Sequence, residues 1–107
     1  MLFMNEDSLN ERQMINVELA NRTLNTKSKE IIKDHVPKEH QEDLLLDFRC
    51  ECSDPNCEER VPLTLKEYEK LHSNQARFVI AKNHESPKVE KVRKQTEDFT
   101  IVEKYAL

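Results

Sequence analysis

The 107-residue sequence contains no glycine and no tryptophan, and it has only three cysteines. Glycine-rich phosphate loops need a close backbone approach that only glycine permits, so the common nucleotide-binding motifs are excluded. The sequence also has no Ser-His-Asp order, nucleophile elbow or H-E-x-x-H motif. We therefore expect a protein that is not an enzyme and has no small-molecule substrate.

Long apolar runs are also missing. No run approaches the roughly 18 residues that a membrane-spanning helix needs. The four apolar residues at the start, MLFM, are followed at once by polar ones, which is too short for the core of a signal peptide. We expect a cytoplasmic protein with no membrane contact, in which thiols stay reduced.

Charge is plentiful but unevenly placed around a formal net charge of −4. Residues 39–59 hold eight acidic residues and one basic residue, whereas residues 60–94 hold nine basic and four acidic residues. A folded domain with this split would have an acidic end and a basic end. The simplest interpretation is a pair of solvated faces, and general polyanion binding is not expected.

Residues 1–37 form the first of two expected parts, a long helix from about Ser8, as N-cap, to Val36. Pro37 disfavours helical geometry at the residue before it and marks the end. The apolar residues of this helix form a thin stripe that suits self-packing, a homodimer or a partner protein. The stripe consists of Met14, Val17, Leu24 and Ile31.

Residues 38–107 are expected to form a compact α+β domain. Strands are predicted over 44–52 and 76–82, with a hairpin of 88–95 and 98–105. A short helix over 62–72 has Thr64 as its cap and Glu67 as capping-box partner, with Leu63 and Tyr68 at the hydrophobic-staple positions. The predicted fold is a small, mostly antiparallel sheet of three or four strands, one short helix and the long N-terminal helix.

All three cysteines lie within eight residues, at Cys50, Cys52 and Cys57, with the spacing C-x-C-x4-C. Two cysteines that are two apart on a strand point to the same side, and the intervening SDPN favours a turn that returns the chain. Clustered cysteines in a reduced compartment favour a metal over a disulfide. Zn²⁺ held by three thiolates and one further ligand would suit this arrangement.

Four histidines are candidates for the fourth ligand. His84 is preferred, because it lies in a loop directly after a predicted apolar strand. His72 is at the end of the short helix, where the helix dipole already favours a cation. His35 and His40 precede the cysteines in a charged segment. A Cys3His set leaves no position for water, which is typical of a structural and not a catalytic zinc.

Unmetallated thiols are the alternative, with a redox sensor as one possibility. The acidic neighbours Glu51, Asp54 and Glu58 are interpreted as surface residues that raise the pKa of the thiols, which counts against redox chemistry.

Residues 46–104 resemble a family of short bacterial proteins of unassigned function. The family pattern is C-E-C-x4-C, L-T-x-x-E-Y, F-x-V, a Gly-His pair and a closing V-E-K. This sequence has CECSDPNC, LTLKEY, FVI, Asn83-His84 and VEK at the corresponding places. It implies that Cys50, Cys52, Cys57 and His84 are the recurring cysteine and histidine positions. The sequence departs from the pattern at Asn83, where the family has glycine, but asparagine tolerates the same left-handed turn.

Two kinds of function remain in view besides a redox sensor. The favoured hypothesis is a zinc-binding interaction module that binds a protein or its own copy and has a regulatory role, by analogy in transcription. The alternative is a nucleic-acid-binding module that uses the basic 60–94 surface. Its candidate residues are Lys88, Lys91, Arg93 and Lys94, which alternate between the two faces of the predicted hairpin and so form no single stripe.

Overall fold

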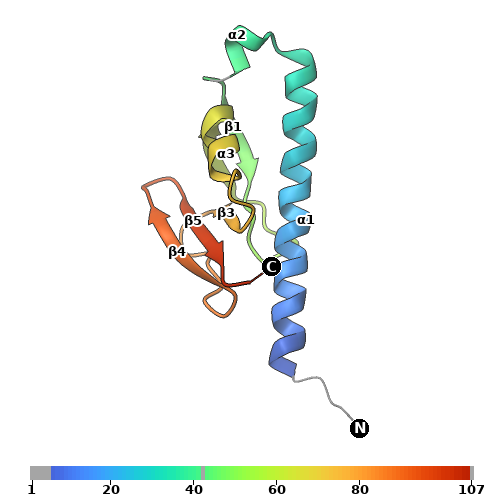
Figure 1. Cartoon of the computed structure of the whole chain (residues 1–107), viewed down its shortest axis with the longest axis vertical. Helices are drawn as coiled ribbons and strands as arrows, with labels where there is room; N and C mark the ends of the chain where they lie inside the picture. The colour runs from blue at the N-terminus through green and yellow to red at the C-terminus, as the bar shows by residue number, and fades with distance from the viewer. Residues whose placement is uncertain (1–5, 42, 107) are drawn as a thin grey trace.

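The computed structural model describes residues 6–41 and 43–106, with side chains from residue 10 onward. The long helix α1 (Glu6–His35) runs along one side of the molecule, and the rest of the chain folds against it (Figure 1). The elements that follow are α2 (Lys38–Gln41), β1 (Leu45–Arg49), β2 (Arg60–Thr64), α3 (Leu65–Leu71), β3 (Arg77–Ile80), β4 (Glu90–Gln95) and β5 (Thr100–Lys104).

The predicted long helix is present, but its predicted start is wrong. Ser8 lies inside α1 and not at its end, because the described helix already includes Glu6. The other end agrees within one residue: α1 ends at His35, and the amide of Val36 still bonds the Ile32 carbonyl before Pro37. No described helix is both long enough and apolar enough to cross a bilayer.

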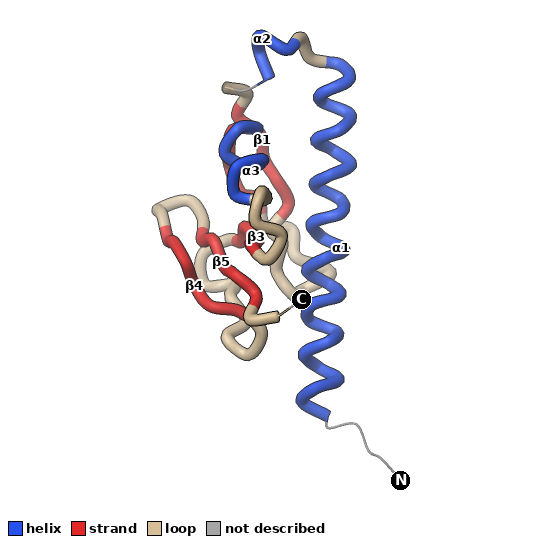
Figure 2. The backbone as a smooth tube through the Cα atoms, in the orientation of Figure 1, coloured by secondary structure: helices blue, strands red, loops and turns tan. Residues whose placement is uncertain are grey.

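The strands form two small antiparallel sheets, so the α+β class is confirmed. β1 pairs with β2, with Leu45 opposite Thr64, and the second sheet has the order β3-β5-β4. All strands lie on the same side of α1 (Figure 2). The sequence pattern did not separate β2 from the start of the following helix, because its Pro62 is a poor strand former.

Helix α3 begins as the sequence predicts. The Thr64 hydroxyl accepts a hydrogen bond from the Glu67 amide at 3.1 Å, and the Glu67 carboxylate accepts one from the Thr64 amide at 3.0 Å. The two hydrophobic-staple residues, Leu63 and Tyr68, are both buried. This well-capped start fixes the direction of α3, and thereby the place of Tyr68 in the core.

The core belongs to the domain that follows α1, which we call the body (residues 43–106). Phe48 stacks on Tyr68 with ring centroids 4.0 Å apart, and Phe78 and Val102 are fully buried nearby. The part of α1 with described side chains adds only Leu19 to this cluster, as a partly buried residue.

The residues that α1 does bury are polar. Glu18, Asn21 and Asn25 are its buried side chains within the described part. Glu18 contacts Lys104 of β5, whose ammonium also binds the carboxylate of Glu90 in β4. Burial raises the pKa of Glu90 to about 7. The interface between α1 and the body is therefore built from hydrogen bonds and charges.

Candidate metal centre

Four side chains from two loops converge beside α1. Cys50, Cys52 and Cys57 lie in the connection between β1 and β2, and His84 lies in the loop after β3. The three sulfur atoms and one ring nitrogen all lie within 4.8 Å of one another. The thiols are buried and His84 is partly exposed, so the cluster sits just beneath the surface.

The distances fit a tetrahedral zinc ion. The Nδ1 atom of His84 lies 3.5 Å from the sulfur of Cys50 and 3.6 Å from that of Cys57. A tetrahedral Zn²⁺ with Zn–S bonds of about 2.3 Å and a Zn–N bond of about 2.0 Å separates sulfur and nitrogen ligands by about 3.5 Å. Three thiolates and one imidazole are also the donors that zinc prefers. The cluster could therefore hold a metal ion with little rearrangement.

Local turn geometry places the third cysteine. The Asp54 carboxylate accepts a hydrogen bond from the Asn56 amide at 2.8 Å, and the Asp54 carbonyl accepts one from the Cys57 amide at 3.3 Å. This is the turn that the SDPN sequence predicts, and it returns Cys57 toward Cys50 and Cys52.

A second turn places the histidine. Asn83 has a φ of 66°, which is left-handed and uncommon outside glycine. The next amide, that of His84, donates to the Ala81 carbonyl at 3.2 Å, and the Ala81 amide points at the sulfur of Cys50 at 3.1 Å. Asparagine thus serves here where glycine would be the usual choice.

The thiols differ in their affinity for protons. The pKa of Cys50 is raised by its hydrogen bond to Cys52 and by burial, and burial raises the pKa of Cys57. The hydrogen bond from Cys50 lowers the pKa of Cys52 to about 5. The expectation that acidic neighbours raise the pKa values is therefore wrong for Cys52, and the raised pKa values of Cys50 and Cys57 come from burial and from the other thiols. Metal binding in thiolate form would release protons from Cys50 and Cys57.

Glu51 is a buried hub and not the surface residue expected from the sequence. It lies between two of the cysteines and is 0% exposed. One carboxylate oxygen accepts hydrogen bonds from the Tyr68 hydroxyl at 2.7 Å and the Asn25 amide at 3.0 Å. The other accepts the Val79 amide at 3.0 Å and lies 2.9 Å from the Nε2 atom of His72. A buried carboxylate with four such partners holds several elements together.

Two asparagines of α1 bind the backbone of the cysteine-bearing loop. The Asn21 side-chain amide donates to the Cys52 carbonyl at 2.8 Å. Asn25 donates to the Arg49 carbonyl and accepts from the Arg49 amide, both at 2.8 Å, as a neighbouring strand would. The loop that carries the thiols is therefore also the surface on which α1 docks.

Sequence reasoning missed this role of Asn21 and Asn25. A usable signal was present, because asparagine is a poor helix former and two of them four residues apart in a long helix need a reason. Side chains spaced by four lie on the same helix face, so the amides of Asn21 and Asn25 point toward the same neighbouring segment.

The remaining histidines lie outside the cluster. His72 packs its ring edge against Tyr68 at 4.4 Å between centroids and contacts Glu51, so it faces away from the thiols. His35 is exposed and bonds the Ile31 carbonyl within its own helix. Of the four histidines, the structure brings only His84 to the cysteines within its described residues.

The stripe proposed for partner binding is divided by the fold. Met14 and Val17 are half-buried, and both line a shallow cavity with Ser53 and Pro55 of the cysteine-bearing loop. Leu24 and Ile31 are 47% and 61% exposed. Only the C-terminal half of the stripe, Leu24 and Ile31, is therefore well exposed for contact with a partner.

The candidate nucleic-acid residues lie on an exposed edge. Lys91, Arg93 and Lys94 are exposed on β4, and Lys88 is exposed just before it. The guanidinium of Arg93 lies 3.9 Å from the carboxylate of Glu103, which offsets part of the positive charge.

Comparison with protein-family models, with curated proteins and with solved structures gave no match. The resemblance to a bacterial family therefore stays a prediction, and the functional argument rests on the molecule itself.

Proposed function

We propose that Cys50, Cys52, Cys57 and His84 hold a structural Zn²⁺ ion. The observation that carries this proposal is the convergence of four zinc-type ligand atoms within 4.8 Å. Four protein ligands complete a tetrahedral shell and leave no position for water or substrate. We therefore propose a structural and not a catalytic role for this centre.

The bound metal fixes α1 as well as the loop. Asn21 and Asn25 bind the backbone at Cys52 and Arg49, on either side of the two strand-end cysteines. A metal that sets the course of this backbone also sets the acceptors that α1 needs. We infer a cytoplasmic interaction module with a regulatory role, in which a zinc-bound body presents α1 to a protein partner or a second copy.

The metal is tested first by native mass spectrometry of protein purified under reducing conditions. Wild type is expected to carry one zinc per chain, and His84→Ala to lose it or bind it more weakly. His35→Ala is the matched control, because this exposed histidine lies outside the cluster. Metal-free wild type from zinc-supplemented cells would contradict the proposal and favour a thiol switch.

The interaction is tested by sedimentation velocity and by quantitative affinity purification with a double variant of the exposed stripe, Leu24→Asp with Ile31→Asp. We expect this variant to lose either self-association or the proteins that wild type retains. Thr23→Asp with Lys27→Asp is the control, since both residues are exposed on the same helix. Equal behaviour of both double variants would remove α1 as the interaction surface.

A further inference from the structure

Two cavities lie end to end along the groove between α1 and α3, which we call the α1/α3 seam. Their volumes are about 300 Å³ and about 250 Å³. The first lies between α1, with Arg22 and Lys29, and His72, the residue that caps the end of α3. The second lies between Lys33 of α1 and Glu69 of α3. From the first cavity to the second, the residue numbers of the lining side chains increase along α1 and decrease along α3. The two helices are therefore antiparallel here, and the two cavities belong to one seam.

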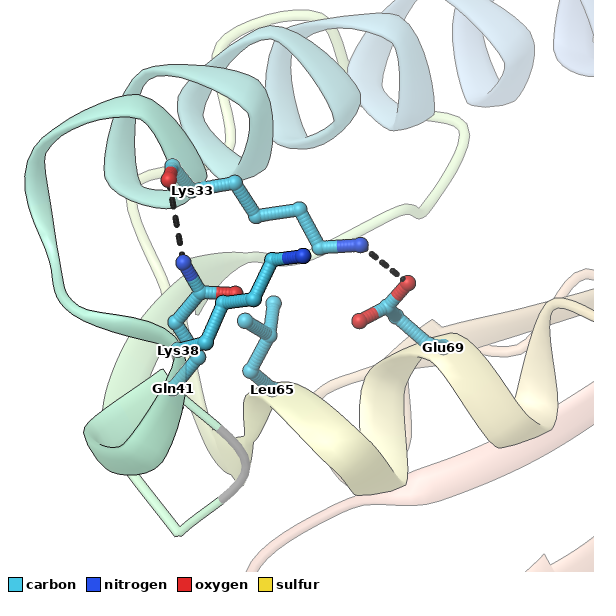
Figure 3. A pocket seen from close by; sticks show the side chains of 5 residues that line it. All are labelled: Lys33, Lys38, Gln41, Leu65 and Glu69. Carbon is cyan, nitrogen blue, oxygen red and sulfur yellow. Dashed lines mark hydrogen bonds and ion pairs between the residues drawn. The ribbon is translucent and has the colours of Figure 1, made fainter.

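The seam is rich in positive charge. Four cationic side chains line it: Arg22, Lys29, Lys33 and Lys38. Glu69 is the one acid among its lining residues, and it pairs with Lys33 at 2.7 Å (Figure 3). Neighbouring charges of one sign in a groove raise the local concentration of the opposite charge.

Most of this charge is not neutralised. Lys29 and Lys38 have no hydrogen-bond or ion-pair partner among residues 10–41 and 43–106. Arg22 donates to the Gln75 carbonyl at 2.6 Å and lies over the Phe78 ring, which positions its guanidinium and leaves further N–H groups for a ligand. The seam therefore presents fixed and free donors to an anion.

The spacing of these cations suits an extended chain. At 1.5 Å per residue, α1 separates Arg22 from Lys29 by about 10 Å and Lys29 from Lys33 by about 6 Å. An extended peptide rises about 3.3 Å per residue, so five or six residues span this distance and alternate side chains fall about 7 Å apart. Carboxylates on such a peptide would meet successive cations.

The chemistry favours a peptide over a nucleic acid. Among the residues that line the seam there is no Phe or Trp, and the one Tyr, Tyr68, is only 1% exposed. No Phe, Tyr or Trp ring of the seam is therefore free to stack on a base. We propose that the α1/α3 seam binds a short, extended, acidic segment of the partner protein. This inference rests on the proposed interaction function and names the chemistry of its partner.

The test uses fluorescein-labelled hexaglutamate with the zinc-loaded full chain, read by fluorescence anisotropy at low ionic strength. Wild type is expected to bind this probe, with an affinity that falls as salt is added. Lys29→Glu with Lys38→Glu is expected to weaken binding by about tenfold or more, because two attractive contacts become repulsive. These two side chains have no partner in the described structure, so their exchange should leave the fold intact.

Lys91→Glu with Lys94→Glu is the matched control. It makes the same change in net charge on exposed positions of β4, away from the seam. A change of less than about twofold in this variant supports the seam, whereas an equal loss in both variants would show only an effect of net charge and would overturn the proposal.

Hexathymidylate with the same label is the second probe. Tighter binding of the oligonucleotide through Lys29 and Lys38 would overturn the peptide assignment. Absence of hexaglutamate binding would overturn the seam proposal alone, because zinc content and the Leu24/Ile31 variants test the proposed function separately.

Discussion

The core of the body and the interface with α1 are held together in different ways. The body buries aromatic and aliphatic side chains such as Phe48, Phe78 and Val102. The α1 interface buries Glu18, Asn21 and Asn25, each with a specific partner in the body. Apolar burial tolerates small shifts, whereas hydrogen bonds are lost when their geometry changes.

This difference has a consequence for stability. A buried polar group without its partner costs more than its bond contributed, so the α1 interface depends on the exact course of the body backbone. The loop that carries the three cysteines supplies much of that backbone. The body can therefore keep its core in states where α1 has lost its acceptors.

Removal of the metal should have the largest effect. Structural zinc contributes on the order of 10 kcal/mol to the folding of small domains, so chelation should release α1 and broaden or abolish cooperative unfolding. Hydrogen exchange by mass spectrometry and thermal circular dichroism measure both effects. EDTA preloaded with zinc is the control, and an unchanged melting curve after zinc removal would contradict a structural role for the metal.

Phe78→Ala should damage the core directly. This side chain is 0% exposed, and truncation of a buried phenylalanine costs about 3–5 kcal/mol. The loss is measured by urea unfolding with zinc present. Phe99→Ala is the comparison, because Phe99 is only half-buried and its truncation should lower the free energy of unfolding clearly less. Equal losses in the two variants would contradict the assignment of Phe78 to the core.

Asn25→Ala should act on the interface and spare the core. It leaves the Arg49 amide without its partner and removes one donor from Glu51, at a cost of about 1–3 kcal/mol. We expect faster hydrogen exchange in α1 with unchanged zinc content and unchanged protection of β3 and β5. Thr23→Ala, exposed on the same helix, is the control. Faster exchange throughout the body would show that the two regions are not separable.

Glu90→Gln should reveal a smaller, pH-dependent term. Burial raises the pKa of Glu90 from 4.5 to about 7. Protonation of Glu90 therefore stabilises the fold fully below the unfolded-state pKa, and this stabilisation is lost as the pH rises through about 7. The variant has no such titration, so wild type should lose about 2 kcal/mol relative to it between about pH 5 and pH 7.5.

That measurement compares the urea midpoints of wild type and variant across the pH series with zinc present. Glu97→Gln, exposed in the hairpin turn, is the control. A constant difference across the series would mean that Lys104 keeps Glu90 ionised at every pH.

Local signals predicted the parts of the fold that depend on neighbours in the sequence. The capping box of Thr64 and Glu67, the hairpin and the turns around Asn56 and Asn83 are set within a few residues. The four residues of the cluster were identified because cysteine and histidine have few other reasons to gather. Zinc as the metal and a partner for α1 stay predictions.

Long-range pairing is what the sequence could not supply. A buried glutamate such as Glu51 looks like any surface acid until its donors arrive from α1, α3 and β3. The same is true of the α1/α3 seam, because Arg22 and Lys29 of α1 line it together with Glu69 of α3 only after folding. The apolar stripe was therefore given more weight than the polar face beside it.

The three residues Cys50, Glu51 and Cys52 have one more implication, for engineering. Successive side chains of an extended segment point to opposite sides, so the thiols face one way and the carboxylate faces the other. One inserted residue would exchange the two sides, sending a thiol toward Tyr68 and the carboxylate toward the cysteine and histidine cluster. Grafting this cysteine-bearing loop onto another scaffold thus requires an accompanying set of donors for the central glutamate, and the smallest transferable unit includes Asn25 and Tyr68.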